Sequence, residues 1–496
     1  MIRKPVATVA LGTACALALT ACAVGPNYHR AAAPPSVAFK EGQGWKPASP
    51  AQIANEQWWT IYDDPALSAL EEQVEVSNQN LKAAVANYYA AREAVTVTRG
   101  SFFPSIGLGA GATRSGGEGS RSGALSGPSG IVQTGSGTRT LYDAQGTASW
   151  DLDIWGKIRR EVESDVAKAQ ASAADVAAAR LSAQATLAED YFQLRAAEQQ
   201  LRLLKTSVQD YQVSLKIAQS QVNAGTTTLA DVYSARTLLE NTIAQENEVE
   251  LSRAKFEHAI AVLVGKAPSE LTMAQGEFTA TVPVVPAGVP SELLLRRPDI
   301  AGAERDLESA DAEIGVAEAA WFPSLTLSGS FGYESSSLSH LIGASNQVWS
   351  FGPSVAETLF QGGAILGQIR ENRALYDSAV ATYRETVLTA FQQIEDDLAT
   401  LNYLQTDYAQ ENEAVVDAER SETLTLNQYR AGTAAYSSVI VAQTTRLNAE
   451  ITALNVQSQR LVASADLIDA MGGGWNSAQL KARNEGVTET LKSTLR

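Results

Sequence analysis

The sequence predicts an α+β protein built from two tandem repeats, each of which combines long helices with amphipathic strands. Three observations lead to this prediction. Two blocks of sequence recur at fixed spacings, apolar residues repeat every seven positions along one very long segment, and four short segments alternate between apolar and polar residues. A helical period and a strand period within the same repeat are typical of the α+β class.

The N-terminus has the order of segments that is typical of a secretory signal peptide. The basic pair Arg3 and Lys4 is followed by an apolar run from Val6 to Leu19, which is too short to span a bilayer as a helix. We therefore expect residues 1–21 to be removed on export.

The end of this signal resembles a bacterial lipobox, because it reads Leu19-Thr20-Ala21-Cys22. The resemblance implies that Cys22 becomes the first residue of the mature chain and carries an N-palmitoyl and an S-diacylglycerol group. Ala23, rather than an acidic residue, follows Cys22, which favours sorting to the outer membrane. The alternative is an ordinary signal peptide in which the cysteine is incidental.

Composition argues against several kinds of partner and site. Cys15 leaves with the signal and Cys22 would carry lipid, so the mature chain of this two-cysteine protein has no thiol for a disulfide or a metal. Without the two basic residues of the signal, 36 basic residues face 55 acidic ones, and the net charge of −19 argues against nucleic acid as a partner. We expect no metal cofactor, because the three histidines are scattered: His29, His258 and His340.

Two pairs of motifs identify the internal repeat. Gln221-Val-Asn-Ala-Gly-Thr226 recurs 207 residues later as Gln428-Tyr-Arg-Ala-Gly-Thr433. Phe103-Pro-Ser-Ile-Gly-Leu108 recurs 219 residues later as Phe322-Pro-Ser-Leu-Thr-Leu327. The first copy must therefore contain twelve extra residues between its two motifs. The Gly/Ser-rich segment from Ser115 to Thr138 lies there and has the composition of an exposed loop.

The expected domain boundaries follow from this repeat. They are 1–21 for the signal peptide, 22–65 for a lipid-anchored N-terminal segment, 66–265 for repeat 1, 266–297 for a linker, 298–472 for repeat 2 and 473–496 for a C-terminal tail. Each repeat is expected to hold one β-hairpin, at about 104–153 and about 323–358, followed by helices at about 158–264 and about 363–470.

Heptad spacing predicts the long helices. Apolar residues recur every seven positions from Leu187 to Val222, and the second copy keeps this register from Ile394 to Val415 before the seam breaks at Glu422. A helix from about Ile158 to Val222 would be ~100 Å long at 1.5 Å per residue, so it must protrude from any compact domain. The alternative for these helices alone is a solid coiled-coil stalk.

Four segments alternate between apolar and polar residues, as a strand does when one side meets lipid and the other meets water. In the first segment Ile106 and Leu108 alternate with Gly107 and Gly109. A surface hairpin on a soluble core gives the same pattern, but the lipid signal favours a membrane. No segment after Cys22 has the apolar length of a membrane-spanning helix, so any crossing must use strands. Aromatic residues available for interfacial girdles are Tyr142, Trp150, Tyr333 and Trp349.

Four strands in one chain cannot close a barrel in lipid. An open sheet edge would leave backbone N–H and C=O groups without partners in hydrocarbon, so the chain is expected to oligomerise. Two copies would give eight strands, whose interior side chains fill the barrel, whereas three copies would give twelve and leave room for a lumen. We therefore expect a homotrimer.

Together the motifs resemble those of the outer-membrane efflux factors, the TolC-like family, in its NodT-like or OprM-like lipoprotein branch. The resemblance covers nearly the whole mature chain. It is carried by Cys22-Ala-Val-Gly-Pro-Asn-Tyr28, Trp58-Trp59, Asp63-Asp64-Pro65 with Leu67, both Phe-Pro-Ser turns, Arg296-Arg297-Pro298-Asp299-Ile300 and both Ala-Gly-Thr turns. It implies a TolC-like trimeric channel, in which a 12-stranded β-barrel continues into a long α-helical periplasmic barrel with an equatorial belt of chain ends and connectors.

The same resemblance implies function, partners and location. Family members are passive, gated exit ducts for drugs and small molecules in tripartite efflux pumps of the Gram-negative cell outer membrane. The implied partners are a periplasmic adaptor (a membrane fusion protein), an inner-membrane pump of the RND (resistance-nodulation-division) type and outer-membrane lipid. One alternative is the channel of a type I protein secretion system, because the pump selects the cargo. Another is a lipid-anchored coiled-coil envelope scaffold.

Two sets of candidate site residues follow from the resemblance. The turns Ala224-Gly225-Thr226 and Ala431-Gly432-Thr433 would form the tip at which the adaptor docks, and each also fits an ordinary turn in which glycine ends a helix. Family members often carry an acidic ring just past the second turn, but Ser438 stands in the matching stretch here, which has no acid. Its equivalent in the first repeat, Asp231, is the candidate gate residue; alternatively, it is an acid favoured by the helix dipole.

No set of residues predicts catalysis. Adjacent acids such as Asp63-Asp64 and Glu395-Asp396-Asp397 are usually solvated, and neither a nucleophile elbow nor a phosphate loop accompanies them. We therefore expect that the protein is not an enzyme.

Overall fold

The computed structural model describes residues 23–34, 39–41, 57–116, 138–278, 281–283, 296–478 and 480. The chain divides into two compact units, and each unit contains parts of both repeats. Unit 1 comprises residues 1–30, 90–169 and 305–380, and unit 2 comprises residues 31–89, 170–304 and 381–496. The signal peptide and Cys22 lie outside the described residues.

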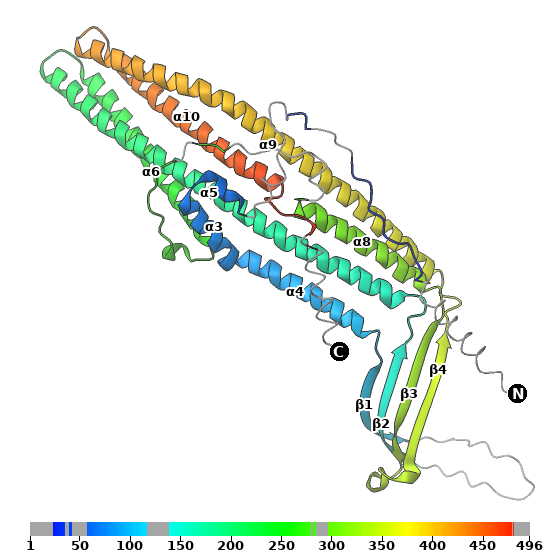
Figure 1. The fold of residues 1–496 in the computed structure, drawn as a ribbon. Coiled ribbons are helices and arrows are strands. Elements are labelled where there is room, and N and C mark those ends of the chain that lie inside the picture. Colours follow the sequence, from blue (N-terminus) through cyan, green and yellow to red (C-terminus); the bar gives the residue numbers. More distant parts are fainter. Residues whose placement is uncertain are drawn as a thin grey trace, which may run out of the picture. The chain divides into compact units, whose positions relative to one another are not determined.

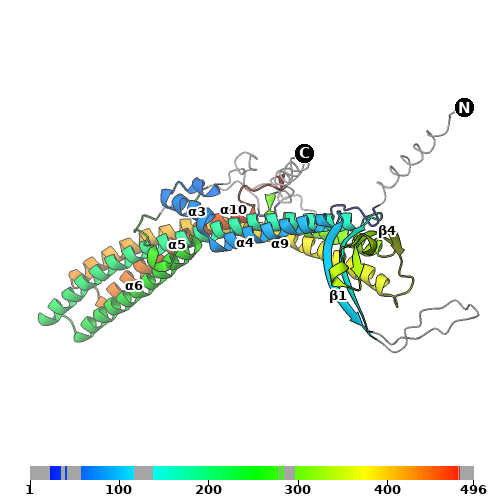
Figure 2. The same ribbon diagram turned by 90° about the horizontal axis from the view of Figure 1, so that it is seen from below.

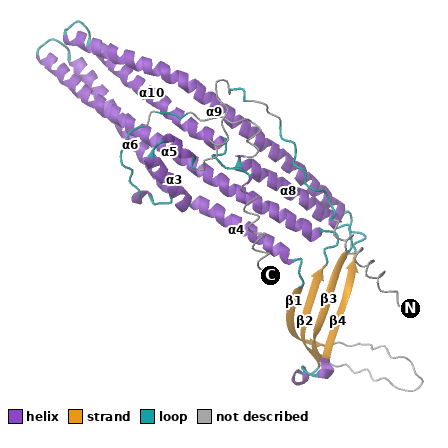
Figure 3. Cartoon of the chain, in the orientation of Figure 1, coloured by secondary structure: helices purple, strands orange, loops and turns teal. Residues whose placement is uncertain are grey.

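The chain combines four strands with long helices, which confirms the α+β class (Figures 1 and 3). The strands are β1 (Ser105–Ser115), β2 (Arg139–Asp151), β3 (Ser324–Ser335) and β4 (Gln347–Ala356). The helices are α3 (Pro65–Ser77), α4 (Gln79–Gly100), α5 (Lys157–Asn223), α6 (Leu229–Leu263), α8 (Pro298–Ala319), α9 (Ala364–Arg430) and α10 (Tyr436–Ala470). Short 3-10 helices lie at Trp58–Tyr62, Pro268–Glu270, Leu338–His340 and Ala344–Asn346. Among the described helices, none has the length and apolar character needed to cross a membrane.

Equivalent helices of the two repeats have equal lengths. Helices α5 and α9 each have 67 residues, and helices α6 and α10 each have 35. Helix α9 begins 207 residues after α5, and α10 begins 207 residues after α6. The spacing of the two Ala-Gly-Thr motifs is therefore the spacing of two complete helical hairpins.

Unit 1 contains one antiparallel sheet whose strand order, β1-β2-β3-β4, is the order of the chain (Figure 1). Ile106 lies opposite Ala148, Ala148 opposite Gly329, and Gly329 opposite Phe351. Directly opposed residues share a face, so this register gathers the apolar side chains of all four strands on one face. That face includes Ile106, Leu108, Trp150, Leu327, Phe331, Trp349, Phe351 and Val355.

The other face of the sheet is polar. Ser330 Oγ lies 2.9 Å from Ser350 Oγ, and Thr326 Oγ1 donates to Asp151 Oδ1 at 2.7 Å. Phe351, on the apolar face, is 72% exposed in the single chain. The alternation predicted from the sequence therefore produces a sheet with one polar face and one exposed apolar face.

A proline lies in the outer edge of this sheet. Leu152 N–H donates to the carbonyl oxygen of Leu325 at 2.9 Å, so the backbone of Leu325 points toward β2 and that of the next residue, Thr326, toward β4. Ser354 lies opposite Thr326 and points back toward β3. Its neighbour Pro353 therefore points away from β3, to the free edge, where the missing N–H leaves no gap inside the sheet.

Each strand of unit 1 is joined directly to a helix, and these helices lie in the same order as the strands. Helix α4 leads into β1 and α8 into β3, whereas α5 follows β2 and α9 follows β4. Polar contacts join neighbouring helices: Thr98 Oγ1 donates to Asp165 Oδ2 (2.5 Å), Ser164 Oγ lies beside Ser309 Oγ (2.9 Å), and Arg373 Nη2 donates to Glu318 Oε1 (2.7 Å).

Both Phe-Pro-Ser motifs end a helix and begin a strand. The last turns tighten, because Phe103 N–H donates to the Gly100 carbonyl at 3.0 Å and Phe322 N–H donates to the Ala319 carbonyl at 3.1 Å. Pro104 and Pro323 then prevent a further helical turn, since proline has no N–H and disfavours a helical residue before it.

The main apolar core lies in unit 2, where α3, α5, α6, α9 and α10 pack together. Leu187, Leu194 and Ile394 are fully buried there, which confirms that this part of the predicted heptad seam faces a core, whereas the later members Val208 and Val415 are only partly buried. Trp59 packs into the same core, and Tyr62 lies 2.7 Å from Ser464 through their hydroxyl groups. The view from below shows α3 beside the long helices of this unit (Figure 2).

Helix α3 also buries a carboxyl group. Glu71 is fully buried, and neither of its carboxyl oxygens has a hydrogen-bond partner among the described residues. Burial raises the pKa of Glu71 to about 9, and the nearby charge of Glu75 adds to the effect. The folded chain therefore holds this side chain protonated and neutral at pH 7.

Stability should fall as pH rises through the range in which only the unfolded chain ionises Glu71. The folded pKa of about 9 exceeds the usual 4.5, so the contribution of the proton is complete below about pH 4.5 and is lost toward pH 9. Glu71→Gln keeps the shape without the titration. Its melting temperature should exceed that of the wild type at pH 8, and the gap should shrink at pH 4.

The exposed neighbour Glu72 provides the control for this measurement. Glu72→Gln should leave the pH dependence of the melting temperature unchanged. A difference between wild type and Glu71→Gln that stays constant from pH 4 to pH 8 would contradict the assignment.

Candidate functional site

The residues that follow the predicted lipidation site are held on unit 1 by Arg160. Its buried guanidinium donates to the carbonyl oxygens of Val24 at 3.2 Å and Gly25 at 3.3 Å, and to Asn27 Oδ1 at 3.0 Å. Glu163 pairs with the same guanidinium at 2.7 Å. The lipid on Cys22 stays a prediction, but the segment after Cys22 is bound to α5 through Arg160.

Two glycines allow this segment to approach α8 closely. Gly25 has a φ of +101°, and a Cβ added to it would lie 2.4 Å from Gly315 Cα. Val24 N–H donates to the carbonyl of Trp155 at 2.9 Å, just after β2. The N-terminal segment thus begins beside the end of a strand.

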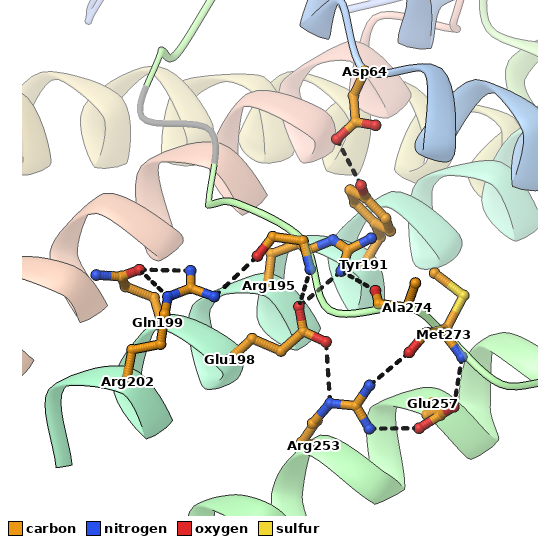
Figure 4. A network of polar contacts seen from close by, with 11 residues as sticks. Asp64, Tyr191, Arg195, Glu198, Gln199, Arg202, Arg253, Glu257, Met273 and Ala274 are labelled. Carbon is orange, nitrogen blue, oxygen red and sulfur yellow. Dashed lines mark hydrogen bonds and ion pairs between the residues drawn. The ribbon is translucent and has the colours of Figure 1, made fainter. Parts of the chain in front are cut away.

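A network of ion pairs in unit 2 holds the linker between the repeats (Figure 4). Glu198, which is 2% exposed, accepts from Arg195 at 2.7 Å, from Arg253 at 3.0 Å and from the backbone N–H of Gly276 at 3.0 Å. The two guanidinium groups also donate to carbonyl oxygens within residues 273–276, at 2.8 and 2.9 Å. One carboxylate and two cations therefore fasten the linker to α5 and α6.

Tyr191 extends this network to the segment before α3. Its hydroxyl donates to Asp64 Oδ2 at 2.6 Å, and the Arg195 guanidinium lies 4.9 Å from the centre of its ring. Asp64 also caps α3, because its Oδ1 accepts from the backbone N–H of Ala66 at 2.8 Å. Asp64 is therefore partly exposed, and both of its carboxyl oxygens accept hydrogen bonds from the chain.

Partly buried acids of three helices lie close to one another, which the sequence alone did not predict. Asp397 of α9 has a pKa raised to about 7, first by burial and then by neighbouring acids. Burial and a hydrogen bond with Asp466 of α10 raise the pKa of Glu189 of α5 to about 8. Among the described residues, no group of three or more histidine, cysteine or acidic side chains is arranged to hold a metal ion.

The two Ala-Gly-Thr turns have the same geometry. Gly225 and Gly432 both have a φ of +74°, and open space surrounds both, so the backbone conformation rather than crowding requires glycine. Thr226 N–H donates to the Gln221 carbonyl at 2.9 Å, and Thr433 N–H donates to the Gln428 carbonyl at 3.0 Å. These bonds cap both helices in the same way. All six residues of the two turns are exposed or partly exposed in the single chain.

The structure places the two candidate gate residues differently. Thr227 Oγ1 donates to Asp231 in the first turn of α6, and the charge of Asp231 contributes, after burial, to raising the pKa of Tyr429. The Tyr429 ring lies 5.2 Å from that of Tyr436. Ser438 is exposed on α10 and lines a surface groove. Asp231 therefore lies against buried aromatic residues, whereas Ser438 does not.

A second ion cluster lies where the heptad seam breaks. Arg446 of α10 pairs with Glu422 at 2.5 Å, with Glu450 at 2.9 Å and with Asp210 of α5 at 3.4 Å. Sequence reasoning identified the break at Glu422 but missed its partner Arg446. At the positions of Glu422, Arg446 and Glu450, the first repeat carries Leu215, Leu239 and Ile243.

Helix α10 is also bound to α5 through Gln443. Its Nε2 donates to Ser214 Oγ at 3.2 Å, and its carbonyl oxygen accepts from the Tyr211 hydroxyl at 3.3 Å. Gln443 is 1% exposed. These contacts join the hairpin of one repeat to the hairpin of the other within a single chain.

The Glu198 network gives a stability prediction. Glu198→Ala leaves the buried Arg195 and the partly buried Arg253 without their shared carboxylate, which should lower the free energy of unfolding by about 3 kcal/mol. Thermal or denaturant unfolding measures the loss, and limited proteolysis should cut residues 266–278 faster. The exposed acid Glu248 of α6 serves as control, because Glu248→Ala should change neither result. Equal stability of Glu198→Ala and wild type would show that the network has no net effect.

Comparison with known proteins gives consistent matches over most of the chain. A family model described as outer membrane efflux protein matches residues 70–266 and 289–473. The toluene efflux pump outer membrane protein TtgC of Pseudomonas putida is 28% identical over 482 residues, which cover 96% of this chain and 98% of the relative. The two stretches matched by the family model fall on the two repeats.

Solved structures agree with this match. The outer-membrane channel OprN superposes with a TM-score of 0.83 at 28% identity, covering 92% of this chain and 100% of that one. The open state of the MtrE outer membrane channel of Neisseria gonorrhoeae gives a TM-score of 0.79 at 26% identity, covering 92% and 99%.

Proposed function

We propose that three copies of this chain close into one gated exit duct for small molecules. The basis is that the chain belongs to the outer membrane efflux protein family. The chain is an outer-membrane channel component of an efflux pump. Such channels work with an adaptor and an inner-membrane pump. The duct is passive, and the pump supplies the energy and selects the cargo.

The observation that carries the proposal is the register of the sheet. It gathers apolar side chains on one face, and on the other it gathers serine, threonine and glycine together with the acids Asp143, Asp151 and Glu334, while β1 and β4 remain edges within the chain. In hydrocarbon, these edges must pair with other strands. Three copies would supply twelve strands, place the apolar face against lipid and line a lumen with the polar face.

Polar groups along the lumen suit a duct for dissolved molecules, and the carboxylates of Asp143, Asp151 and Glu334 among them favour cations. TtgC is named for toluene efflux. By analogy, we propose that this chain conducts drugs or other small molecules. Its proposed partners are a periplasmic adaptor, which would dock at the two Ala-Gly-Thr turns, and an inner-membrane pump of the RND type. An acyl group on Cys22 would anchor each copy in the outer membrane beside the segment that Arg160 holds.

Conductance and mass test the proposal together. The purified lipoprotein in planar bilayers should form small, cation-preferring pores that are mostly closed, and its mass in detergent should be that of three chains. A non-conducting protein without a defined trimer would instead support the scaffold alternative.

Neighbouring residues of β4 supply the matched control for lipid contact. Phe351→Arg places a charge on the face expected to meet lipid, at about 2–4 kcal/mol near the bilayer midplane, and should abolish insertion. Ser350→Arg, on the opposite face, should still insert. Equal insertion by both variants would contradict the assignment of the faces.

The gate is proposed at Asp231. Its contact with Thr227 and its position beside Tyr429 and Tyr436 support a role in holding the helical tip closed. Asp231→Ala removes a charged hydrogen bond of about 1.5 kcal/mol, so the open fraction should rise about tenfold. Closed-state conductance should increase and block by cations should weaken, whereas Ser438→Ala should change neither. Unchanged conductance and cation block in Asp231→Ala would refute the gate.

A further inference from the structure

The joint between β2 and α5 is held by side chains on both sides of it. Asp153 Oδ2 accepts from the backbone N–H of Arg159 at 3.0 Å and from Arg159 Nε at 3.1 Å. Trp155 stacks on Phe322, with the ring centres 4.8 Å apart, and its Nε1 donates to the Pro323 carbonyl at 2.8 Å. These contacts cap the helix and fasten the joint to a distant segment of the chain.

The equivalent joint between β4 and α9 lacks the residues that make these contacts. The residues 207 positions after the acid, the tryptophan and the arginine are Phe360, Gly362 and Leu366, which cannot form the same bonds. Leu359 and Phe360 are each 88% exposed, so neither side chain fastens the joint to the rest of the chain. Both joints lie in unit 1, and only the first is held by side chains.

Two consecutive glycines form this second joint. Gly362 has a φ of +59° and Gly363 a φ of +86°, and open space surrounds both. Gly156, the counterpart of Gly363, has a φ of +82°, but a Cβ added to it would lie 2.9 Å from Ala23. Glycine restricts backbone rotation less than any other residue, so two of them in open space allow the strand and the helix to turn against each other.

The first turns of α9 have few buried side chains. Over the described range 364–377 only Ile369 is buried. The equivalent range of α5, residues 157–170, buries Ile158, Arg160, Ser164, Ala167 and Ala169. Arg373 of α9 pairs with Glu318 of α8 at 2.7 Å, but Arg373 is 63% exposed, and an exposed ion pair holds two helices weakly. The start of α9 therefore adds little resistance to rotation at the joint.

We infer that Gly362 and Gly363 form a hinge between β4 and α9 in the single chain, whereas the joint between β2 and α5 is fixed, and that assembly locks the hinge. The inference rests on the proposed assembly of several copies. Strand β4 is the last of the sheet, and α9 is the last of the adjoining helices. A second copy that pairs with β4 therefore also meets the start of α9, so the helix becomes ordered on its strand as the copies join.

Spin labels test the hinge in the full-length chain, refolded from urea into detergent and separated by mass into single copies and trimers. Ala356→Cys with Leu375→Cys places labels across the second joint, and Ser149→Cys with Lys168→Cys places them at the equivalent positions of the first. In single copies, the distance distribution from double electron–electron resonance should be about twice as wide across the second joint. Equal widths would overturn the inference.

Trimers test the locking step. They are assembled with an excess of unlabelled chains, so that each trimer holds at most one labelled copy. Both pairs of labels should then give narrow distributions, because the second copy holds α9 in one orientation. A distribution across the second joint that stays wide in trimers would show that assembly does not lock the hinge.

Asparagine provides a restricting variant, because it accepts positive φ but rotates less freely than glycine. Gly362→Asn with Gly363→Asn should narrow the distribution across the second joint in single copies, and the open space at both sites accommodates the side chains. Conversely, Asp153→Ala with Arg159→Ala should widen the distribution across the first joint. Widths that neither double substitution changes would show that the glycines and the cap do not control the joints.

Hydrogen exchange tests the hinge without substitutions. In single copies, and after correction for intrinsic rates, the amides of residues 360–367 should exchange about tenfold faster than those of residues 153–160. The two segments should exchange at similar rates in trimers. Equal protection of the two segments in single copies would contradict the hinge.

Locking also predicts an effect on assembly. A chain with a restricted hinge loses less conformational entropy when a second copy binds. Gly362→Asn with Gly363→Asn should therefore reach half-maximal trimer formation at a concentration about two- to fivefold below that of the wild type. An unchanged or higher concentration would overturn the locking step. Single copies that show the hinge but never assemble would overturn the proposed channel, whereas trimers formed by chains with equally narrow joints would overturn the hinge alone.

Discussion

Backbone pairing at the edges of the four-stranded sheet is the constraint on which the rest of the structure depends. Strand order leaves β1 and β4 as edges, and an edge in hydrocarbon has no water to satisfy its N–H and C=O groups. In the proposed channel, the chain is therefore one segment of a closed assembly. Because each strand continues directly into a helix, and the helices follow the order of the strands, closure of the sheet also sets the order of the adjoining helices in unit 1.

The two repeats supply helical hairpins of equal length whose side chains differ at equivalent positions. Helices of 67 and 35 residues occur in both copies. Where repeat 1 carries Leu215, Leu239 and Ile243, repeat 2 buries the ion pairs of Arg446. Equal lengths keep the helices in register, while the side chains at these equivalent positions are apolar in one repeat and charged in the other. Asp210 binds Arg446 across the boundary between the hairpins, so the polar cluster also joins the repeats.

The sequence was sufficient for features that depend on period and spacing. The two-faced strands, the buried heptad seam and the glycine turns are local patterns, and the structure reproduces them. Pairings between distant segments were missed. Glu198 looks like an ordinary charge on a helix surface until the linker and Arg253 lie against it. Asp64 and Asp397 looked solvated for the same reason, since burial depends on which helices cover a residue.

Pro353 affects how readily a single copy of the chain associates wrongly through its sheet edge. A single copy in water exposes an apolar sheet face and two unpaired edges, which is the combination that leads strands to associate wrongly. Because Pro353 points to the outer edge of β4, that edge lacks one donor, and an arbitrary strand that pairs there forms an incomplete ladder. One ring nitrogen without a hydrogen thus makes accidental polymerisation less favourable, at the edge strand that would pair with a neighbouring copy in the proposed channel.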